Sequence, residues 1–548
     1  MKKVYLIPLT LVGLCSITSC GPKASGDPRV VDVFMNEGNT LSGAKKDSIW
    51  QEIEKKTNTT INISGATHGS DYYSNLNLQL NNPKSFKYDI VFSVPSNNDA
   101  HYQSHIDDDL YWNIDELLAM KPGQYPNIEK IIHSEKYKNI TYGEKYHTLV
   151  PFATSNSGWT IYYRSDWLIN IGYVNPDGSA KVPTTMSEFQ DVLEKFTNGN
   201  PDKDPSHATY GLSPAGSFFY WSPLYHAFGV TPDYDLDSND NVTYMYTQAE
   251  FRNFLTWAHD MYSKGYIDPN FSANVPNDGD REKFYNGDVG VLITNGENHV
   301  SWIAPGTEQI QGKNKIICGP APIGDSKVGK EGAGGFSDWG GWWGGYSIFK
   351  RRTGSSSYDT ASAFAALDVL EYLNSQEGGL TRTYGIKDTH WEYGQKNKIV
   401  PLYEARNDEP DKTFTRIKQE NGSYKLSGLY RMGNGWGNRI NWVDDTTFET
   451  VITSENVDFD YKELFKQTVD NCKTVGSRLT NFTNYASGYD EKMNLFEDEL
   501  DTYANAVVRG IPGTRSWEDE ITRLNSTFYW GDIQTMIKEQ AKKAGIID

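Results

Sequence analysis

The stretch VVDVFMNEGN, residues 30–39, predicts a buried strand that runs directly into a polar turn. Downstream, residues 46–57 and 72–80 carry apolar side chains at helical spacing, whereas residues 61–63 and 88–92 are short apolar runs typical of strands. Strands that alternate with helices at this spacing predict an α/β fold, in which a parallel sheet has helices on both faces.

Polar side chains follow two of these strands at the point where each strand ends. Asn36, Glu37 and Asn39 follow the first strand, and residues 93–98 follow the third. Ligands of open α/β sheets bind at the carboxyl ends of the strands. Asn36 and Glu37 are therefore candidate ligand-binding residues.

The first twenty residues predict a lipoprotein export signal. Two lysines precede a mostly apolar run at residues 4–14, and Ile-Thr-Ser-Cys follows at residues 17–20. This is the pattern of a secretory signal, and its end resembles the bacterial lipobox, which implies cleavage before Cys20 and acylation of that cysteine. A membrane-spanning helix needs about 20 apolar residues, more than this run contains. We expect residues 1–19 to be a signal peptide and residues 20–27 a flexible tether, lipid-anchored outside the cytoplasm to the bacterial cell membrane.

Length, charge and cysteine content limit what the chain can be. A chain of 548 residues is too long for a single core, so two or three domains are expected. Its net charge of −19 argues against nucleic acid or an anionic membrane surface as the partner. Cys318 and Cys472 remain once the signal and the lipidated cysteine are set aside; they are either a disulfide, as an exported protein allows, or two buried free thiols.

A family resemblance begins at the stretch YHTLVPFATSNSGWTIYYRSDWL, residues 146–168. It resembles the segment by which the chain first crosses between lobes in the family 1 extracellular solute-binding proteins. There a strand leaves one lobe through a proline and enters the other at a strand-to-helix corner. Further segments resemble the same family in the same order, namely residues 182–196, 210–213, 251–271, 284–298, 377–393 and 505–525. Together they are most similar to its long subfamily of LipO-like and alginate-oligosaccharide-binding lipoproteins.

This resemblance implies a periplasmic-binding-protein-like fold, with two α/β lobes, a hinge and a ligand cleft between the lobes. It implies crossings near Pro151, near residues 320–325 and near residues 388–393. Lobe 1 would comprise residues 28–151 and 325–390, and lobe 2 would comprise residues 152–324 and 391–548.

Two segments rich in glycine and aromatic residues are candidate parts of the cleft. A sugar presents hydroxyl groups and apolar C–H faces, so its site needs flat rings together with fixed polar groups. Residues 334–349 are rich in glycine, which lets a backbone approach a ligand closely; a tight strand pair with inward-facing rings is the alternative. Residues 428–442 combine rings with arginine, whose planar fork would suit a uronic acid; an ordinary surface loop is the alternative. The candidates are Trp339, Trp342, Trp343, Arg431, Asn434, Trp436 and Arg439.

A third set of candidates comes from resemblance alone. In the maltose-binding members of the family, the loops that match residues 216–225 and 293–302 carry ligand contacts. This implies roles for Phe218, Trp221, Glu297 and Asn298, although Asn298 replaces an aromatic residue of the family. Trp159, beside the first crossing, is a further candidate.

A calcium site is also implied by the resemblance. The alginate-binding subgroup has a loop like an EF-hand after the helix that corresponds to residues 182–196, with oxygen ligands at alternate positions. Asn200, Asp202 and Asp204 keep the first three ligand positions. Ala208 and Thr209 replace the acidic pair of the family, so a solvated acidic turn is the alternative to structural Ca²⁺.

The resulting hypothesis is a substrate-binding lipoprotein of an ABC importer. It would capture a carbohydrate, most simply an oligosaccharide, by closure of the lobes, and deliver it as a monomer to the permease subunits in the membrane. No required cofactor is expected. The alternatives are a cell-surface glycan-degrading enzyme and a peptide-binding receptor; the sequence contains no G-x-S-x-G, H-E-x-x-H or P-loop motif that would favour an enzyme.

Overall fold

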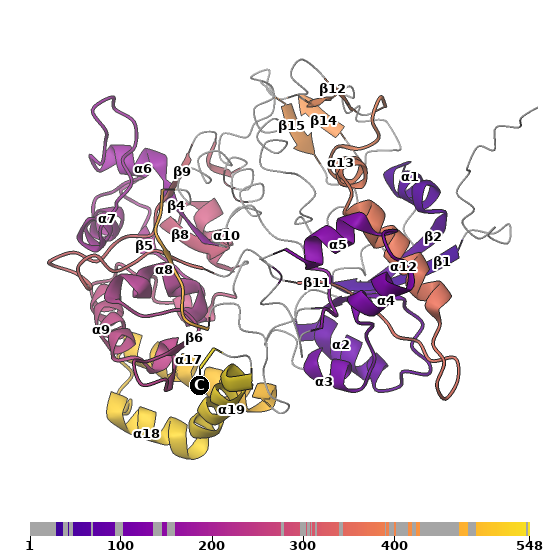
Figure 1. The fold of residues 1–548 in the computed structure, drawn as a ribbon. Helices are drawn as coiled ribbons and strands as arrows, with labels where there is room; N and C mark the ends of the chain where they lie inside the picture. The colour runs from indigo at the N-terminus through magenta and orange to yellow at the C-terminus, as the bar shows by residue number, and fades with distance from the viewer. Residues whose placement is uncertain are drawn as a thin grey trace, which may run out of the picture.

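Two large hydrophobic cores divide the chain into two lobes, which form the right and left halves of Figure 1. A smaller third cluster, which includes Tyr162, Phe284 and Cys318, belongs to lobe 2. The first core draws on residues 31–150 and 346–380, and the second on residues 159–336 and 479–547. The computed structural model describes residues 29–36, 48–66, 70–93, 102–134, 145–150, 159–275, 279–295, 315–338, 344–389, 391–393, 399–401, 415–418, 424–427, 471–479, 489–543 and 546–547, together with the single positions 42, 46, 137, 303, 307 and 310–312.

The sheet of lobe 1 has four strands in the order β11-β3-β1-β2. β1 (Arg29–Asn36) pairs in parallel with β2 (Thr59–Ala66) and with β3 (Ile90–Ser93), as the alternation of strands and helices predicts. β11 (Gly345–Ile348) pairs with β3 in the antiparallel direction, so the sheet is mixed and the expectation of a purely parallel sheet was wrong. β11 is antiparallel because the chain reaches it directly from lobe 2. Among the described elements, no crossover helix within lobe 1 directly precedes it, as would be needed for a parallel pair with β3.

Seven helices are described in lobe 1. α1 (Ser48–Thr57) turns Ile49, Trp50 and Ile53 toward the core, which confirms the predicted apolar face. The others are α2 (Ser70–Leu80), α3 (Tyr102–Asp107), α4 (Ile114–Met120), α5 (Pro126–Ile132), α12 (Thr360–Leu373) and α13 (Gln376–Tyr384). Side-chain caps fix where three of them begin, since Asn113, Asp359 and Ser375 each accept a hydrogen bond from a first-turn backbone N–H.

The sheet of lobe 2 has the order β5-β8-β4-β9. All six residues of β4 (Trp159–Arg164) are buried, and this strand is antiparallel to both β8 (Val289–Asn295) and β9 (Ile316–Gly319). β5 (Tyr210–Leu212) is parallel to β8. The carboxyl ends of β5, β8 and β9 therefore lie at the same edge as the first residue of β4.

Helices from the middle and from the end of the chain pack together in lobe 2. α7 (Met186–Asn198) begins as the sequence predicts, because Thr185 Oγ1 accepts a hydrogen bond from the N–H of Glu188 and the Glu188 carboxylate accepts one from Thr184. Helix α9 (Ala249–Ser263) packs against α17 (Tyr489–Val508), which follows it by more than 200 residues (Figure 1). The remaining helices are α6 (Ser165–Asn170), the 3₁₀ helix η3 (Phe218–Trp221), α8 (Ser222–Tyr225), η4 (His226–Phe228), η5 (Met245–Thr247), η6 (Phe271–Ala273), α10 (Gly279–Asn286), α18 (Trp517–Thr527) and α19 (Trp530–Lys543).

The second crossing between the lobes lies later than the sequence predicted. Phe336 is fully buried in the core of lobe 2, and its strand β10 (Phe336–Ser337) pairs with β16 (Thr474–Val475). Gly345 already belongs to the sheet of lobe 1. The crossing therefore lies between Asp338 and Gly345, and the boundary at residue 325 was about 15 residues too early because residues 325–338 fold back onto lobe 2.

Three further two-stranded sheets complete the described elements. β6 (Tyr234–Leu236) and β7 (Val242–Tyr244) form a hairpin in lobe 2. β12 (Trp391–Tyr393) pairs with β13 (Ile399–Pro401), and β14 (Thr415–Lys418) pairs with β15 (Tyr424–Ser427).

Candidate functional site

Three aromatic rings form a corner beside the carboxyl end of β8 in the lobe 2 sheet, an edge that we call the ligand edge because ligands of α/β sheets bind at such ends. Trp159 begins β4 opposite Asn295, the last residue of β8. Its ring lies 5.3 Å from that of Phe219 and 5.4 Å from that of Tyr220, centroid to centroid. Phe219 is 43% exposed, whereas Trp159, against whose ring it packs, is 4% exposed. A large, half-exposed ring on a rigid base suits the apolar face of a ligand.

Phe218 and Trp221 do not line this corner, so the ligand-contact roles implied for them were wrong. Both side chains are completely buried, and their rings stack on each other 4.9 Å apart inside lobe 2. Trp221 also donates a hydrogen bond from Nε1 to the carbonyl of Ala215 (2.9 Å). Side chains three residues apart share a face of a 3₁₀ helix. Because positions 218 and 221 pack inward, the side chain at position 219 points outward. The three-residue spacing of Phe218 and Trp221 is therefore the sequence signal that could have predicted an exposed ring at Phe219.

The loop that carries Phe219 is fixed by polar contacts on both sides. The N–H of Phe218 donates to Asp501 Oδ1 (3.2 Å), and Asn505 Nδ2 donates to the carbonyl of Gly216 (3.0 Å). The N–H of Gly216 donates to the carbonyl of Asn274 (3.0 Å). A Cβ atom at Gly216 would lie 2.6 Å from the carbonyl oxygen of Ser272, so only glycine fits this close approach of two backbones.

A buried cation lies behind the aromatic corner. Arg281 on α10 is 7% exposed and donates from Nη2 to Thr294 Oγ1 (3.3 Å) near the end of β8. Burial lowers the pKa of the guanidinium, and the neighbouring Tyr285, Asp280, Tyr162 and Tyr220 oppose that shift. The corner therefore has a positively charged group close to Tyr220 in an otherwise acidic protein.

The ligand edge of lobe 1 lies where both crossings meet. β1 ends at Asn36, and Ser93 at the end of β3 is paired with Gly345 at the start of β11. Leu149 and Tyr346 exchange two backbone hydrogen bonds (2.9 and 3.0 Å), so the chain leaves lobe 1 and re-enters it at adjacent positions. Two crossing segments that lie side by side at one edge of a sheet suit a hinge.

Hydroxyl groups tie the two crossing strands to lobe 1. Thr148 Oγ1 lies 2.7 Å from Tyr102 Oη and 2.7 Å from Ser347 Oγ, and all three groups are buried. Tyr137 Oη donates to the carbonyl of Val150 (3.0 Å). These bonds fix the lobe 1 ends of both crossings, as a defined pivot requires.

Most of the other sequence candidates lie outside the described residues, and they stay predictions. They are Glu37, Glu297, Asn298, Trp339, Trp342, Trp343, Arg431, Asn434, Trp436 and Arg439. Asn36 is described only as the last residue of β1. Residues 339–343 connect Asp338 of lobe 2 to Gly345 at the ligand edge of lobe 1.

The acidic loop after α7 uses carboxylate oxygens for contacts within the loop. Asp202 Oδ2 lies 2.6 Å from His207 Nδ1, and Asp204 Oδ1 accepts hydrogen bonds from the N–H and Oγ of Ser206. No carboxylate stands at positions 208 and 209. Within the described ranges, no group of three or more His, Cys, Asp or Glu residues is arranged to hold a metal. The oxygen atoms of this loop thus hold the loop itself together, and a calcium ion here stays an untested prediction.

Cys318 and Cys472 are both free thiols. Cys318 is buried in β9, where burial raises the pKa of its thiol to about 12, while Cys472 is only partly buried. Of the two alternatives that the sequence left open, a disulfide or two free thiols, the structure has two free thiols.

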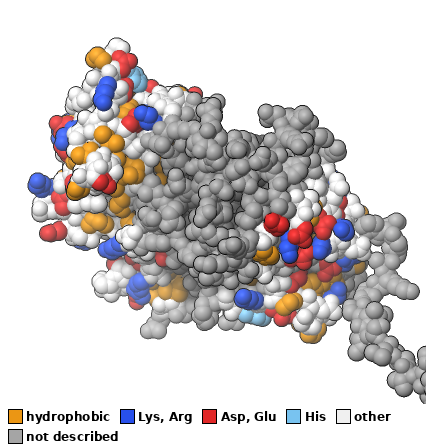
Figure 2. Space-filling view, turned by 90° about the horizontal axis from the view of Figure 1, so that it is seen from above, with side chains coloured by type: hydrophobic (Ala, Val, Ile, Leu, Met, Phe, Trp, Pro, Cys, Tyr) orange, Lys and Arg blue, Asp and Glu red, His pale blue; other side chains and the backbone are white. Residues whose placement is uncertain are grey.

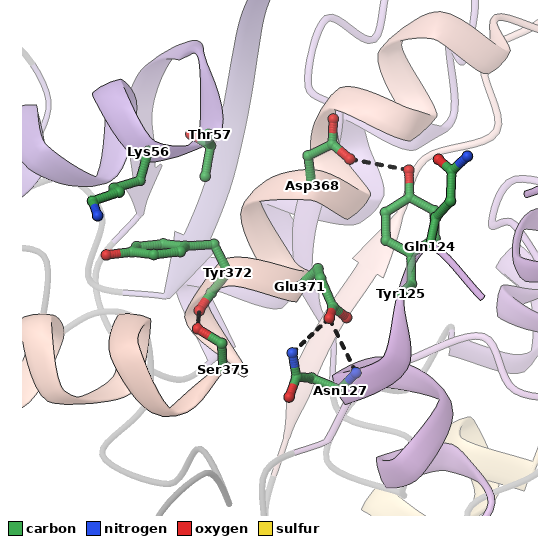
Figure 3. Close-up of a pocket in the computed structure, with 9 residues that line it drawn as sticks. All are labelled: Lys56, Thr57, Gln124, Tyr125, Asn127, Asp368, Glu371, Tyr372 and Ser375. Carbon is green, nitrogen blue, oxygen red and sulfur yellow. Dashed lines mark hydrogen bonds between the residues drawn. The ribbon is translucent and has the colours of Figure 1, made fainter. Parts of the chain in front are cut away.

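A cavity of about 390 Å³ opens on lobe 1 beside α5 and α12 (Figure 3). Its polar groups are engaged with one another: Tyr125 Oη donates to Asp368 Oδ1 (3.0 Å), and the Glu371 carboxylate accepts from the N–H groups of Asn127 and Ile128 at the start of α5 (both 3.0 Å). Asp368 also pairs with Arg29 (2.7 Å). These contacts attach α5 to α12, and the cavity belongs to this packing and not to the aromatic corner of lobe 2.

The described surface shows no dominant charge in the view of Figure 2. Acidic and basic side chains are interspersed on both lobes, and hydrophobic side chains gather on the lobe at the left of that view. Among the helices that the structure describes, none combines the length and the apolar character needed to cross a bilayer.

Two curated proteins are similar to parts of this chain. YtcQ of Bacillus subtilis, a polygalacturonan/rhamnogalacturonan-binding protein, is 25% identical over 256 residues, which cover 46% of this chain. The match spans 47% of YtcQ, about half of its length. Lipoprotein LipO of Bacillus subtilis is 23% identical over 421 residues, which cover 74% of this chain and 77% of LipO.

The fold and the family follow from two further comparisons. The crystal structure of an extracellular solute-binding protein from Bifidobacterium longum subsp. infantis superposes with a TM-score of 0.61 at 15% identity, over 95% of this chain and 99% of that one. It shows that the two-lobed α/β fold is that of a periplasmic binding protein. The sequence profile of the bacterial extracellular solute-binding proteins matches residues 48–387, more than half of the chain. The chain therefore belongs to the bacterial extracellular solute-binding protein family.

Proposed function

We propose that this protein is the substrate-binding lipoprotein of an ABC importer and that it captures an oligosaccharide between its lobes. The observation that carries the proposal is the aromatic corner of Trp159, Phe219 and Tyr220 at the ligand edge of lobe 2. A half-exposed phenyl ring fixed on a buried tryptophan offers a flat surface to the C–H face of a sugar ring.

The chemistry around the corner favours an acidic plant-wall oligosaccharide. Arg281 lies near Tyr220 and beside the buried carboxyl of Asp280, and the name of YtcQ gives polygalacturonan and rhamnogalacturonan as what that protein binds. Arginine is the side chain that best recognises a carboxylate. Oligogalacturonides are therefore the first ligands to test.

Binding would work by closure about the hinge. A sugar that contacts Phe219 on lobe 2 and the ends of β1 and β3 on lobe 1 stabilises the closed arrangement, because only that arrangement makes both sets of contacts. The permease subunits would recognise the closed state, and the lipid on Cys20 would keep the receptor beside them. The protein acts as a monomer and leaves its ligand unaltered.

Calorimetric titration tests the proposal directly. The protein from Cys20 onward is titrated with oligogalacturonides, rhamnogalacturonan fragments and, as neutral controls, malto-oligosaccharides and fructo-oligosaccharides. We expect a dissociation constant in the micromolar range or below for at least one oligosaccharide, together with a rise in melting temperature by mass action. Chromatography of the recovered sugar should show it intact. A broad panel without any binding would refute the sugar assignment, and a shortened sugar would show an enzyme instead.

A further inference from the structure

Two side chains of α17 hold the loop that presents Phe219, although they lie almost 300 residues away in the sequence. Asp501 Oδ1 accepts the N–H of Phe218, the residue directly before Phe219 (3.2 Å). One turn later on the same helix, Asn505 Nδ2 donates to the carbonyl of Gly216 (3.0 Å) and also to the carbonyl of Asp501 (2.8 Å). Two backbone groups of the loop, the N–H of Phe218 and the carbonyl of Gly216, are thus hydrogen-bonded to one helix.

Asp501 meets the loop backbone as a partly buried carboxyl group. Burial raises the pKa of this carboxyl to about 6, while the N–H of Phe218 and the side chain of Ser217 oppose the shift. The group is therefore mostly ionised at neutral pH. A carboxylate that accepts a backbone N–H makes a charge-assisted hydrogen bond, and at 3.2 Å this one is long for its type.

The helix itself is firmly placed in lobe 2. Phe496, Leu500 and Ala504 on α17 are buried in the second core, and the Phe496 ring stacks on Trp530 of α19 at 4.9 Å and 8°. The loop backbone that carries Phe219 is therefore held by α17, whose contacts with the core of lobe 2 lie away from the aromatic corner.

We propose that Asp501 and Asn505 are positioning residues for ligand binding, which act by holding the 216–218 backbone so that the Phe219 ring stands at the cleft. The inference rests on the proposed function. It adds that the affinity for sugar depends on a helix near the end of the chain that makes no contact with the sugar. A ring that is already placed binds more tightly than one that must be ordered on binding.

Three single variants at Asp501 and Asn505 test the inference, together with a control variant, Phe219→Ala and a double variant. Asp501→Ala removes the acceptor and should weaken oligosaccharide binding about tenfold. Asp501→Asn keeps an oxygen acceptor and should stay within about twofold of wild type. Asn505→Ala removes the second contact and should weaken binding about threefold to fivefold. An exposed amide of the same helix gives the matched control for Asn505→Ala, since Asn494→Ala should change nothing.

The double variant separates positioning from general damage. If Asp501 acts through Phe219, then Asp501→Ala should cost no further affinity once Phe219→Ala is present. A full additional loss in the double variant would overturn the inference. If Asp501→Ala does not fold, Asn505→Ala with and without Phe219→Ala answers the same question.

Hydrogen exchange of the ligand-free protein tests the loop independently of any sugar. Asp501→Ala should speed the exchange of the Phe218 and Tyr220 amides about tenfold, while amides of β4 and β8 keep their wild-type rates. Unchanged exchange at Phe218 would overturn the inference even if binding falls. Faster exchange in a protein whose wild type binds no sugar would leave the loop contact established and refute the proposed function alone.

Discussion

The adjacent residues Phe218 and Phe219 should respond to truncation in opposite ways. Phe218 is completely buried, stacked on Trp221 and edge-on to Phe251 at 6.1 Å. Loss of a fully buried phenyl ring costs about 3–5 kcal/mol of unfolding free energy. Phe219 is 43% exposed, so truncation there gives up roughly half of a transfer free energy of about 2–3 kcal/mol. The contact with Trp159 adds about 0.5–1 kcal/mol.

Melting temperatures and calorimetric titrations separate these two effects. For a lobe of this size each kcal/mol lowers the melting temperature by about 2–4 °C. Phe218→Ala should therefore melt about 10 °C or more below wild type, yet its folded fraction at 20 °C should bind sugar within a few-fold of wild type. Phe219→Ala should melt about 3–6 °C below wild type and bind about tenfold more weakly, which corresponds to 1.4 kcal/mol.

The reasoning would be refuted if Phe219→Ala bound oligosaccharide as well as wild type while Phe218→Ala lost binding at full stability. That result would mean that the side chain of Phe218 contacts the ligand and that the side chain of Phe219 packs inside lobe 2. Phe219→Tyr is a suitable matched variant, because it keeps a ring at the exposed position and should retain most of the affinity.

The remaining predictions concern titration, calcium and the lipid anchor. Glu497 accepts a hydrogen bond from Tyr244 Oη (2.6 Å), and burial raises its pKa from 4.5 to about 7. The folded state thus keeps a proton that the unfolded chain releases, so this stabilisation is complete below pH 4.5 and is lost as the pH rises through 7. Because the side chain is only half-buried, Glu497→Gln should gain about 1 kcal/mol at pH 8 and nothing at pH 4.5, measured by thermal unfolding; an equal gain at both pH values would contradict the cause. Calcium chelation should leave the melting temperature unchanged within about 1 °C, because the loop oxygens already bind His207 and Ser206; a calcium-dependent rise that disappears in Asp204→Asn would contradict this. Cys20→Ser should abolish palmitate labelling and move the protein from the membrane to the soluble fraction; membrane retention would show another anchor.

Local patterns in the sequence predicted the elements of lobe 1 because they depend on neighbouring residues alone. The apolar spacing in residues 46–57 identified α1, and the apolar runs at residues 61–63 and 88–92 identified β2 and β3 within a few residues. The direction of β11 could not be predicted in this way. A buried strand has the same apolar pattern whether its neighbour runs parallel or antiparallel.

The site was predicted less well because it depends on contacts between distant segments. Phe218 and Phe219 are identical as residues, and only the inward packing of Trp221 decides which ring is exposed. The late second crossing has a similar cause, since Phe336 joins lobe 2 through a strand pair with Thr474 that no local pattern predicts. Asp501 could not be linked to Phe218 from sequence, because 283 residues separate them.

The order in which the chain builds its two sheets has a consequence for folding. β1, β2 and β3 are synthesised first, but the edge strand β11 begins only at Gly345, after the whole sheet of lobe 2. Lobe 2 in turn gains α17 only from Tyr489 onward. An N-terminal fragment therefore leaves β3 as an uncovered edge, and unpaired edges promote aggregation. Neither lobe can be complete before most of the polypeptide is available, so this edge stays uncovered until the chain beyond Gly345 has joined lobe 1.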